Sequence, residues 1–141
     1  RQRWVAAGTL HDALRDAGEV ELREILTGRY RDLHPALLHG PAAAVLLEGD
    51  ADEAILNAIR YHTLGHPDLD RLGRALYLAD FLEPGRPFAA EWRASLRARV
   101  PHELDEVLIE VLGARLEHTI SARRAIRPET AAFWSAVVSG R

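Results

Sequence analysis

Residues Ile59 to Arg86 read IRYHTLGHPDLDRLGRALYLADFLEPGR, and this stretch decides the fold. Its apolar residues recur at helical spacing, which places His62 on the apolar side of one helix. Asp80 lies inside ALYLADFL, an apolar run in the next helix. Because a carboxylate is costly to bury unless it is paired or bound to a metal, we interpret Asp80 as a metal ligand. A buried helix cap or a salt bridge to an arginine is the alternative.

Helical patterns continue on both sides of this stretch. A helix that carries Ile55 to His62 is opened by Asp50, which has capping-box spacing to Glu53. The longest helix starts at Pro101 and extends an apolar stripe to Ile120. We expect further helices over residues 3–17, 19–27, 41–47, 70–82, 87–99 and 129–138. No two-residue alternation is sustained anywhere, so the predicted fold class is all-α, a single domain of packed helices.

The composition is typical of a globular protein. The chain has 141 residues, of which 48% are hydrophobic and 28% charged, enough for one domain with a buried core. A net charge of -3 without a basic stripe argues against nucleic-acid binding. No leader and no apolar span of membrane length are visible, so we expect a cytoplasmic protein that does not associate with membranes.

The chain contains no cysteine, so any bound metal must be held by nitrogen and oxygen ligands. Five such donors lie on successive predicted helices: His11, Asp12, His39, His62 and Asp80. Together they suit iron, manganese, zinc or a similar ion. His39 stands at a helix start, where the helix field favours the neutral ring that a metal requires.

Taken singly, each of these donors could have a purely structural role. His11 could be a packed histidine, with Asp12 paired to Arg15 three residues on. His39 could be a surface histidine, and His62 could be a core histidine with satisfied hydrogen bonds. A purely structural helical bundle accounts for the apolar stripes, but it gives no reason for five polar donors in apolar settings.

The residues also carry a family resemblance. A His-Asp pair followed by a lone Asp on a later helix resembles the HD-domain metal phosphohydrolases. The strings LLHGP at 37–41, ILNAIRYHTLGHP at 55–67 and LYLADFLEPGR at 76–86 resemble the YqeK family within that superfamily, as does IRPETAAFW at 126–134. The resemblance covers nearly the whole chain, and it identifies residues 1–141 as an HD domain.

This resemblance implies a symmetrical diadenosine tetraphosphate hydrolase, which cuts the central phosphoanhydride and releases two molecules of ADP. The implied cofactor is a centre of two iron ions, with manganese or another divalent ion as the alternative. The implied metal ligands are His11, Asp12, His39, His62 and Asp80, with Asp12 bridging. The implied substrate-binding residues are Arg15, Arg60, Thr63, His66 and Arg86. Asp12 and His66 are the implied catalytic residues.

Three departures from the family pattern matter. The family's first ligand is a histidine on a helix before the His-Asp pair, and no histidine precedes His11, so we expect the first helix of the domain to be lacking. Arg15 stands where the family usually has lysine, and an arginine does not easily give up a proton. His66 stands where arginine is common, which replaces a fixed charge by a group that titrates near neutral pH.

A bound divalent metal can lower the pKa of its water from about 15.7 to roughly 7, which would supply the attacking oxygen. No Walker-type loop and no Ser/His/Asp arrangement is present, so a covalent intermediate is not expected. Two further functions stay open. One is an HD-type nucleotide phosphatase of different specificity, and the second is a non-catalytic module that binds ADP or a dinucleoside polyphosphate. The oligomeric state is open as well, a homodimer included.

Overall fold

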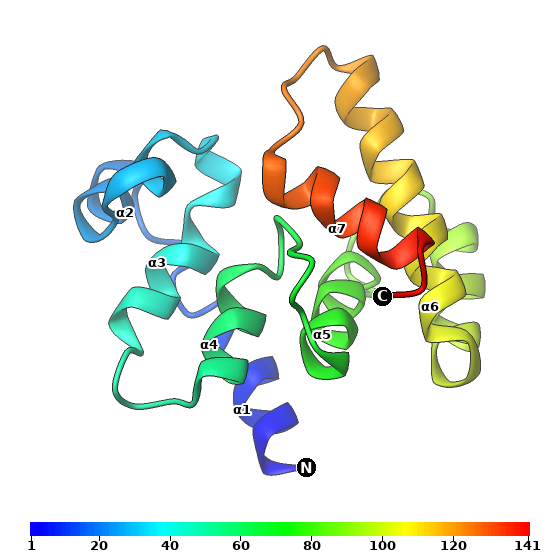
Figure 1. Cartoon of the computed structure of the whole chain (residues 1–141), viewed down its shortest axis with the longest axis horizontal. Coiled ribbons are helices and arrows are strands. Elements are labelled where there is room, and N and C mark those ends of the chain that lie inside the picture. The colour runs from blue at the N-terminus through cyan, green and yellow to red at the C-terminus, as the bar shows by residue number, and fades with distance from the viewer. The chain divides into compact units, whose positions relative to one another are not determined.

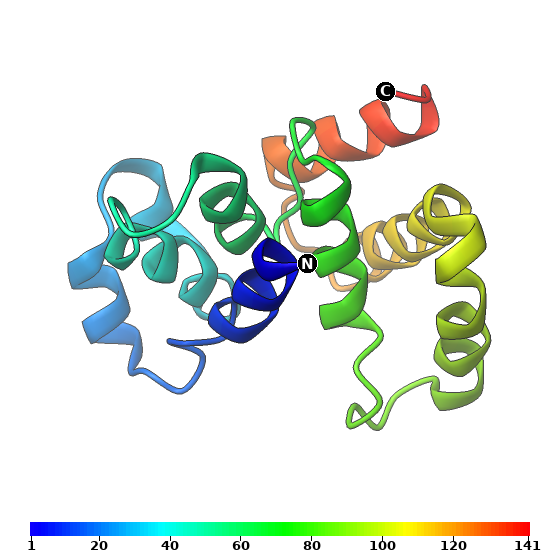
Figure 2. The same cartoon turned by 90° about the horizontal axis from the view of Figure 1, so that it is seen from below.

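The computed structural model describes residues 1–141, and its only regular elements are helices, as the sequence predicts. Two short 3-10 helices, η1 (Gly28–Asp32) and η2 (Pro35–Leu37), connect α2 to α3. The α-helices are α1 (Gln2–Leu10), α2 (Glu19–Ile25), α3 (His39–Leu46), α4 (Glu53–Arg60), α5 (Arg71–Phe81), α6 (Ala90–Ser121) and α7 (Pro128–Val138), shown in Figures 1 and 2. None of these helices combines the length and the apolar character that a membrane crossing requires.

The chain divides into two compact units. The first unit consists of Arg1–Leu64 and Leu69–Tyr77, and the second of Gly65–Asp68 and Leu78–Arg141. Helix α5 therefore supplies residues to both units, since its first part lies in the first unit and its last turn in the second.

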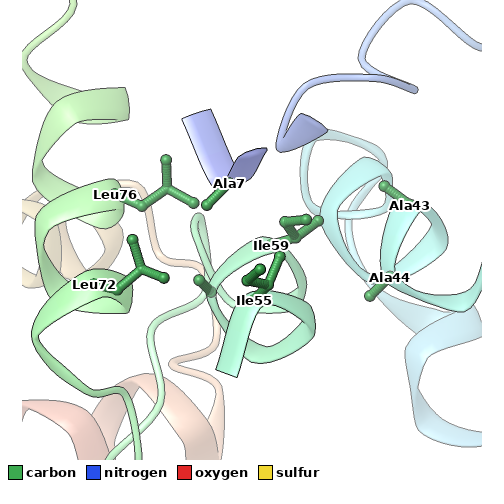
Figure 3. Close-up of a cluster of buried hydrophobic side chains, with 8 residues drawn as sticks. Ala7, Ala43, Ala44, Ile55, Ile59, Leu72 and Leu76 are labelled. Atoms are coloured by element: carbon green, nitrogen blue, oxygen red, sulfur yellow. The ribbon is translucent and has the colours of Figure 1, made fainter. Parts of the chain in front are cut away.

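The core of the first unit brings α1, α3, α4 and the start of α5 together. Its buried residues are Ala7, Ala43, Ala44, Ile55, Ala58, Ile59, Leu72 and Leu76. Figure 3 shows α4 between α5, which supplies the two leucines, and α3, which supplies two alanines. Alanine on α1 and α3 lets these backbones approach α4 closely. This packing places the end of α1, the start of α3 and the end of α4 near one another.

Helix α2 ends at Ile25, two residues before its predicted end, and α1 and α4 end early for a shared reason. Helix α1 ends at Leu10, and residues 11–16 form turns, so the predicted helix over 3–17 is wrong in its second half. Helix α4 ends at Arg60, so His62 lies in the turn that follows. In both cases a histidine ring nitrogen bonds to a carbonyl three residues earlier, Gly8 for His11 and Ile59 for His62. An uninterrupted helix would use that carbonyl for the N–H four residues on, so the side chain competes with helix extension.

Two further details of the first unit concern helix starts. The cap of α4 is Asp52, whose carboxylate accepts the N–H of Ile55 at 3.0 Å, so the assignment of the cap to Asp50 is wrong. Asp52 directly precedes the first helical residue, where its side chain can reach the free N–H groups. His39 is the first residue of α3, so this helix begins two residues before its predicted start at 41, and His39 stands at a helix start as predicted.

The second unit is built on α6 and α7. The sequence pattern predicts two helices, over 87–99 and after Pro101. Helix α6 consists of two such helices, and they meet at a kink at Glu103 (φ -133, ψ 42), two residues after Pro101. Pro101 has no N–H to bond to the preceding turn, which weakens the helix at this point. After the kink Val107, Leu108, Val111 and Leu112 are fully buried, whereas Ile120 is exposed, so the predicted stripe ends too late. Phe133 and Val137 of α7 are buried in the same unit.

Candidate metal centre

The first unit brings four of the five predicted donors together from three segments. His11 and Asp12 follow α1, His39 opens α3, and His62 follows α4. Ligand atoms of His11, Asp12 and His62 all lie within 4.8 Å of one another. The Nε2 atom of His39 lies 3.0 Å from Nε2 of His62 and 3.2 Å from Oδ1 of Asp12. Residues separated by 51 positions in the chain (11 to 62) thus converge on one point, and their role as ligands stays a prediction.

Backbone contacts determine which ring nitrogen of two histidines is available. Nδ1 of His11 lies 2.8 Å from the carbonyl of Gly8, and Nδ1 of His62 lies 2.7 Å from the carbonyl of Ile59. Because a carbonyl can only accept, each Nδ1 must carry the proton. In the neutral ring the lone pair is therefore on Nε2, the atom that faces the cluster. A hydrogen bond on the opposite ring nitrogen is the usual way in which proteins orient a metal-binding histidine.

Asp12 supplies the negative charge among these rings. Its Oδ1 is buried, makes no hydrogen bond of good geometry, and lies 3.4 Å from Nε2 of His62. When the rings are protonated, hydrogen bonding from His62 holds the pKa of this carboxyl well below its usual range, against an opposing effect of burial, and the charges of His11, His62 and His39 lower it further. A buried oxygen without a proper donor beside lone-pair nitrogens is the arrangement that a cation would complete.

Gly40 allows the close approach of α3 to α4 at the cluster. A Cβ at this position would lie 2.9 Å from the carbonyl oxygen of Ile59 and 3.1 Å from two ring atoms of His62. Only a residue without a side chain leaves that oxygen and that ring in place. Gly40 therefore positions His62, although its own atoms offer no ligand.

Asp80 belongs to the second unit. Its side chain is 7% exposed, and Oδ1 lies 3.1 Å from Nη2 of Arg86. The salt bridge to an arginine, the alternative to a metal for this carboxylate, is thus present. An ion pair of one oxygen does not exclude a second role for the carboxylate, so the ligand role of Asp80 stays a prediction.

The predicted substrate-binding residues lie in both units. Arg15 is half exposed, with Nη1 3.5 Å from Oδ2 of Asp12, and Arg60 donates to Oδ1 of Asn57 at 2.6 Å. The hydroxyl oxygen of Thr63 is buried. In the second unit, Nδ1 of His66 accepts the N–H of Asp68 at 3.1 Å, and Arg86 also lies near Glu83. Because Nδ1 of His66 accepts a hydrogen bond, its neutral ring carries the proton on Nε2, the opposite tautomer from His11 and His62.

Sequence reasoning missed two residues, Gly40 beside the histidines of the first unit and Arg93 in the second unit. Gly40 follows the candidate ligand His39 directly, and a glycine next to a ligand inside the first turn of a helix is a signal that could have been noticed. Arg93 is 1% exposed and binds backbone carbonyls, but nothing in the sequence distinguishes it from the exposed arginines around it.

Comparison with known proteins identifies a family whose model covers the residues of the histidine cluster. A family model described as HD domain matches residues 1–85. The protein named symmetrical bis(5'-nucleosyl)-tetraphosphatase from Bacillus subtilis is 30% identical over 142 residues, which cover 95% of this chain and 75% of that protein. The protein of the same name from Halalkalibacterium halodurans is 31% identical over 102 residues, covering 70% of this chain and 54% of that protein.

A solved structure is also similar. It is the crystal structure of a predicted HD superfamily hydrolase involved in NAD metabolism from Clostridium acetobutylicum, with a TM-score of 0.83 and 27% sequence identity. The match covers 96% of this chain and 76% of that one. The family and the His/Asp cluster both indicate a divalent metal site. The family model, the relatives and the shared structure together show that the chain belongs to the HD-domain family, within its YqeK group.

Proposed function

We propose that this protein is a metal-dependent hydrolase that cleaves diadenosine tetraphosphate symmetrically into two molecules of ADP. The observation that carries the proposal is the convergence of three imidazole nitrogens and one buried carboxylate oxygen in the first unit. The names of the Bacillus and Halalkalibacterium relatives support the substrate and the position of the cut.

The proposed ligands are His11, Asp12, His39, His62 and Asp80, and two iron ions are the first choice, with manganese as the alternative. The donor set fits such ions because it contains only nitrogen and oxygen, and because two rings already present Nε2 lone pairs. A divalent ion held there would supply an activated water and would offset charge on the phosphate oxygens.

The remaining residues would bind and orient the polyphosphate. Arg86, Arg60 and Arg15 offer guanidinium groups that can form paired hydrogen bonds with phosphate oxygens, and Thr63 offers a hydroxyl. Neutral His66 would donate a hydrogen bond from Nε2, because its Nδ1 accepts one from the backbone. Such prealigned donors stabilise charge that builds up in the transition state.

The reaction balances as a hydrolysis. A water oxygen forms a bond to one of the two central phosphorus atoms, and the bond from that phosphorus to the bridging oxygen breaks. The bridging oxygen leaves as a terminal phosphate oxygen of the second ADP, which the Nε2–H of His66 would stabilise, and the proton lost by the water passes to solvent. No covalent intermediate with the protein is needed.

The test is product analysis in water enriched in 18O. Protein loaded with iron or manganese is expected to give ADP as the only nucleotide product, with half of the ADP carrying one heavy oxygen. AMP together with ATP would exclude the symmetrical cut. A substrate panel of mononucleotides separates the dinucleotide hydrolase from a general nucleotide phosphatase.

Two variants complete this experiment. Asp80→Ala is expected to lose bound metal, measured by elemental analysis, while far-ultraviolet circular dichroism stays unchanged. Asp68→Ala is the control, because Asp68 is an exposed acid of the same unit that lies outside the proposed ligand set. Full metal retention by Asp80→Ala would remove Asp80 from the ligand set.

We further propose that the protein acts in the cytoplasm on free dinucleotides and does not bind nucleic acid. Its net charge of -3 supports the second statement, since nonspecific binding to nucleic acid depends on clustered basic charge. A homodimer is the assembly to test, by light scattering at the concentrations used for the assay.

A further inference from the structure

The side chain of Arg93 is buried in the second unit and binds four backbone carbonyls. Nε donates to the carbonyl of Phe81 at 3.1 Å, and Nη1 donates to those of Arg86 at 2.7 Å and Phe88 at 3.2 Å. Nη2 donates to the carbonyl of Glu83. The residue as a whole is 1% exposed. One guanidinium group thus connects the end of α5 to every part of the turn that follows it.

These carbonyls share one physical property. Phe81 is the last residue of α5, where the final carbonyls lack partners inside the helix and carry the negative end of its dipole. The carbonyl of Glu83 also accepts the N–H of Arg86 at 3.2 Å, which closes the turn. Arg93 therefore bonds to a carbonyl at the end of α5 and to three carbonyls of the following turn, and it holds the turn from 82 to 88 in one conformation.

Two effects disfavour the charged form of the Arg93 side chain. Burial lowers the pKa of Arg93, and the neighbouring charges of Arg97 and Arg86 lower it further. The contact of its guanidinium with the ring of Phe88, 4.6 Å from the centroid, is a favourable cation–π interaction. A buried cation close to two other cations is costly unless its donors are all bonded. The four backbone carbonyls around the guanidinium supply those bonds.

The turn that Arg93 holds carries Arg86. The guanidinium of Arg86 reaches back to Asp80 at 3.1 Å, so the turn determines where Arg86 and Asp80 meet. We propose that Arg93 is a positioning residue, which holds the turn from 82 to 88 so that Arg86 is presented to Asp80 and to a phosphate of the substrate. The phosphate part of this inference rests on the proposed function.

Lysine at position 93 keeps the positive charge but loses the planar guanidinium with its several N–H donors. An ammonium group has three donors on one atom, and it cannot reach carbonyls that the guanidinium contacts from three separate nitrogens. Arg97 offers a matched control one turn later in α6, because its Nη1 donates to the single carbonyl of Leu82 at 2.8 Å. A lysine there can keep that one bond.

The first arm of the experiment does not depend on catalysis. The amide exchange rate of Arg86 is measured by NMR in the wild type, in Arg93→Lys and in Arg97→Lys, each relative to the core amide of Leu112. We expect exchange at Arg86 to rise about tenfold or more in Arg93→Lys and to change less than twofold in Arg97→Lys. An unchanged rate in Arg93→Lys would overturn the inference.

The second arm measures KM and kcat for diadenosine tetraphosphate with manganese-loaded protein. Arg93→Lys should raise KM about tenfold, roughly the effect of one charge-assisted hydrogen bond, with a smaller change in kcat. In an Arg86→Ala background the same substitution should change KM less than twofold, because it acts through Arg86. Fully additive effects would overturn the positioning role. If the wild type cleaves no dinucleotide, the proposed function fails while the exchange arm still decides the role of Arg93.

A measurement on the wild type covers the case in which Arg93→Lys does not fold. The Nε proton of Arg93 should exchange at least about a hundredfold more slowly than that of the half-exposed Arg15, and it should show coupling across the hydrogen bond to the Phe81 carbonyl carbon. Exchange as fast as at Arg15, or no such coupling, would overturn the inference.

Discussion

Replacement of Gly40 by alanine should separate metal binding from stability. The new Cβ would lie 2.9 Å from the carbonyl oxygen of Ile59 and 3.1 Å from Cε1 and Nδ1 of His62. Non-bonded heavy atoms are comfortable from about 3.5 Å, so the neighbours must move by roughly half an ångström. The two groups that must move are the partners of the 2.7 Å hydrogen bond that orients the His62 ring.

The expected magnitudes follow from this geometry. Overpacking of a buried site costs typically about 1–3 kcal/mol, but alanine in place of glycine within a helix recovers about 1 kcal/mol. The net loss of stability should therefore be no more than about 2 kcal/mol. Disturbing the hydrogen bond that orients a metal-binding histidine typically costs about 10–100-fold in metal affinity. That loss of affinity is about 1.4–2.8 kcal/mol, similar in size to the loss of stability. Because a domain with about 5–15 kcal/mol of stability stays folded after such a loss, metal affinity should fall in protein that is still folded.

The assay combines two measurements on purified protein. The dissociation constant for manganese or cobalt is measured by competition with a chromophoric chelator, and the free energy of unfolding is measured with urea in the presence of a metal chelator. Gly8→Ala is the matched control, because no atom lies within 4 Å of a Cβ at that helical position, and the carbonyl that orients His11 is kept. That control should be slightly more stable and bind metal as the wild type does.

Two results would refute this reasoning. If Gly40→Ala binds metal with the affinity of the wild type, the close approach of α3 does not determine the position of His62. If affinity falls only because a fraction of the protein is unfolded, the loss should disappear once the affinity is corrected for the measured stability.

Three further predictions concern the first unit. Metal at a hundred times its dissociation constant should stabilise the wild type by about 2.7 kcal/mol, and Asp12→Asn should abolish this gain in urea unfolding. The pKa of Asp52 is lowered chiefly by the N–H of Ile55. The stabilising effect of this carboxylate should therefore be present above pH 3.8 and disappear as the pH falls through the lower folded-state pKa. The difference in melting temperature between the wild type and Asp52→Ala should shrink over the same range. Burial, followed by the hydrogen bond with Tyr30, raises the pKa of Tyr61 to about 12. The wild type should therefore lose stability between pH 10 and 12 more steeply than Tyr61→Phe. Equal slopes in the two proteins would contradict this cause.

The sequence predicts the helices well where the apolar pattern is uninterrupted. The prediction of a last helix over 129–138 differs from α7 by one residue, and that of a helix over 70–82 differs from α5 by one residue at each end. The errors at the ends of α1 and α4 occur where a side chain bonds to the backbone. Periodicity records only which residues are apolar, and it cannot register that the rings of His11 and His62 take carbonyls from the preceding turn.

The sequence predicts the donor residues of the candidate site, but it does not predict the residues that position them. Histidine and aspartate in apolar settings are visible in the sequence because such groups are costly to bury without a partner. The role of Gly40 depends on a distance between two helices, and that of Arg93 depends on the path of a turn. Neither can be derived from the local pattern, since arginine in a helix is usually solvated.

The two backbone bonds that hold the rings of His11 and His62 have a kinetic consequence. Both bonds are made by carbonyls of the protein's own backbone, which orient each ring and fix its tautomer independently of the ion. The entropy of ordering these side chains has been lost during folding, and the rate of loading should depend mainly on how fast the ion sheds its own water shell. Fast-exchanging ions such as manganese should therefore enter rapidly, and nickel should enter slowly.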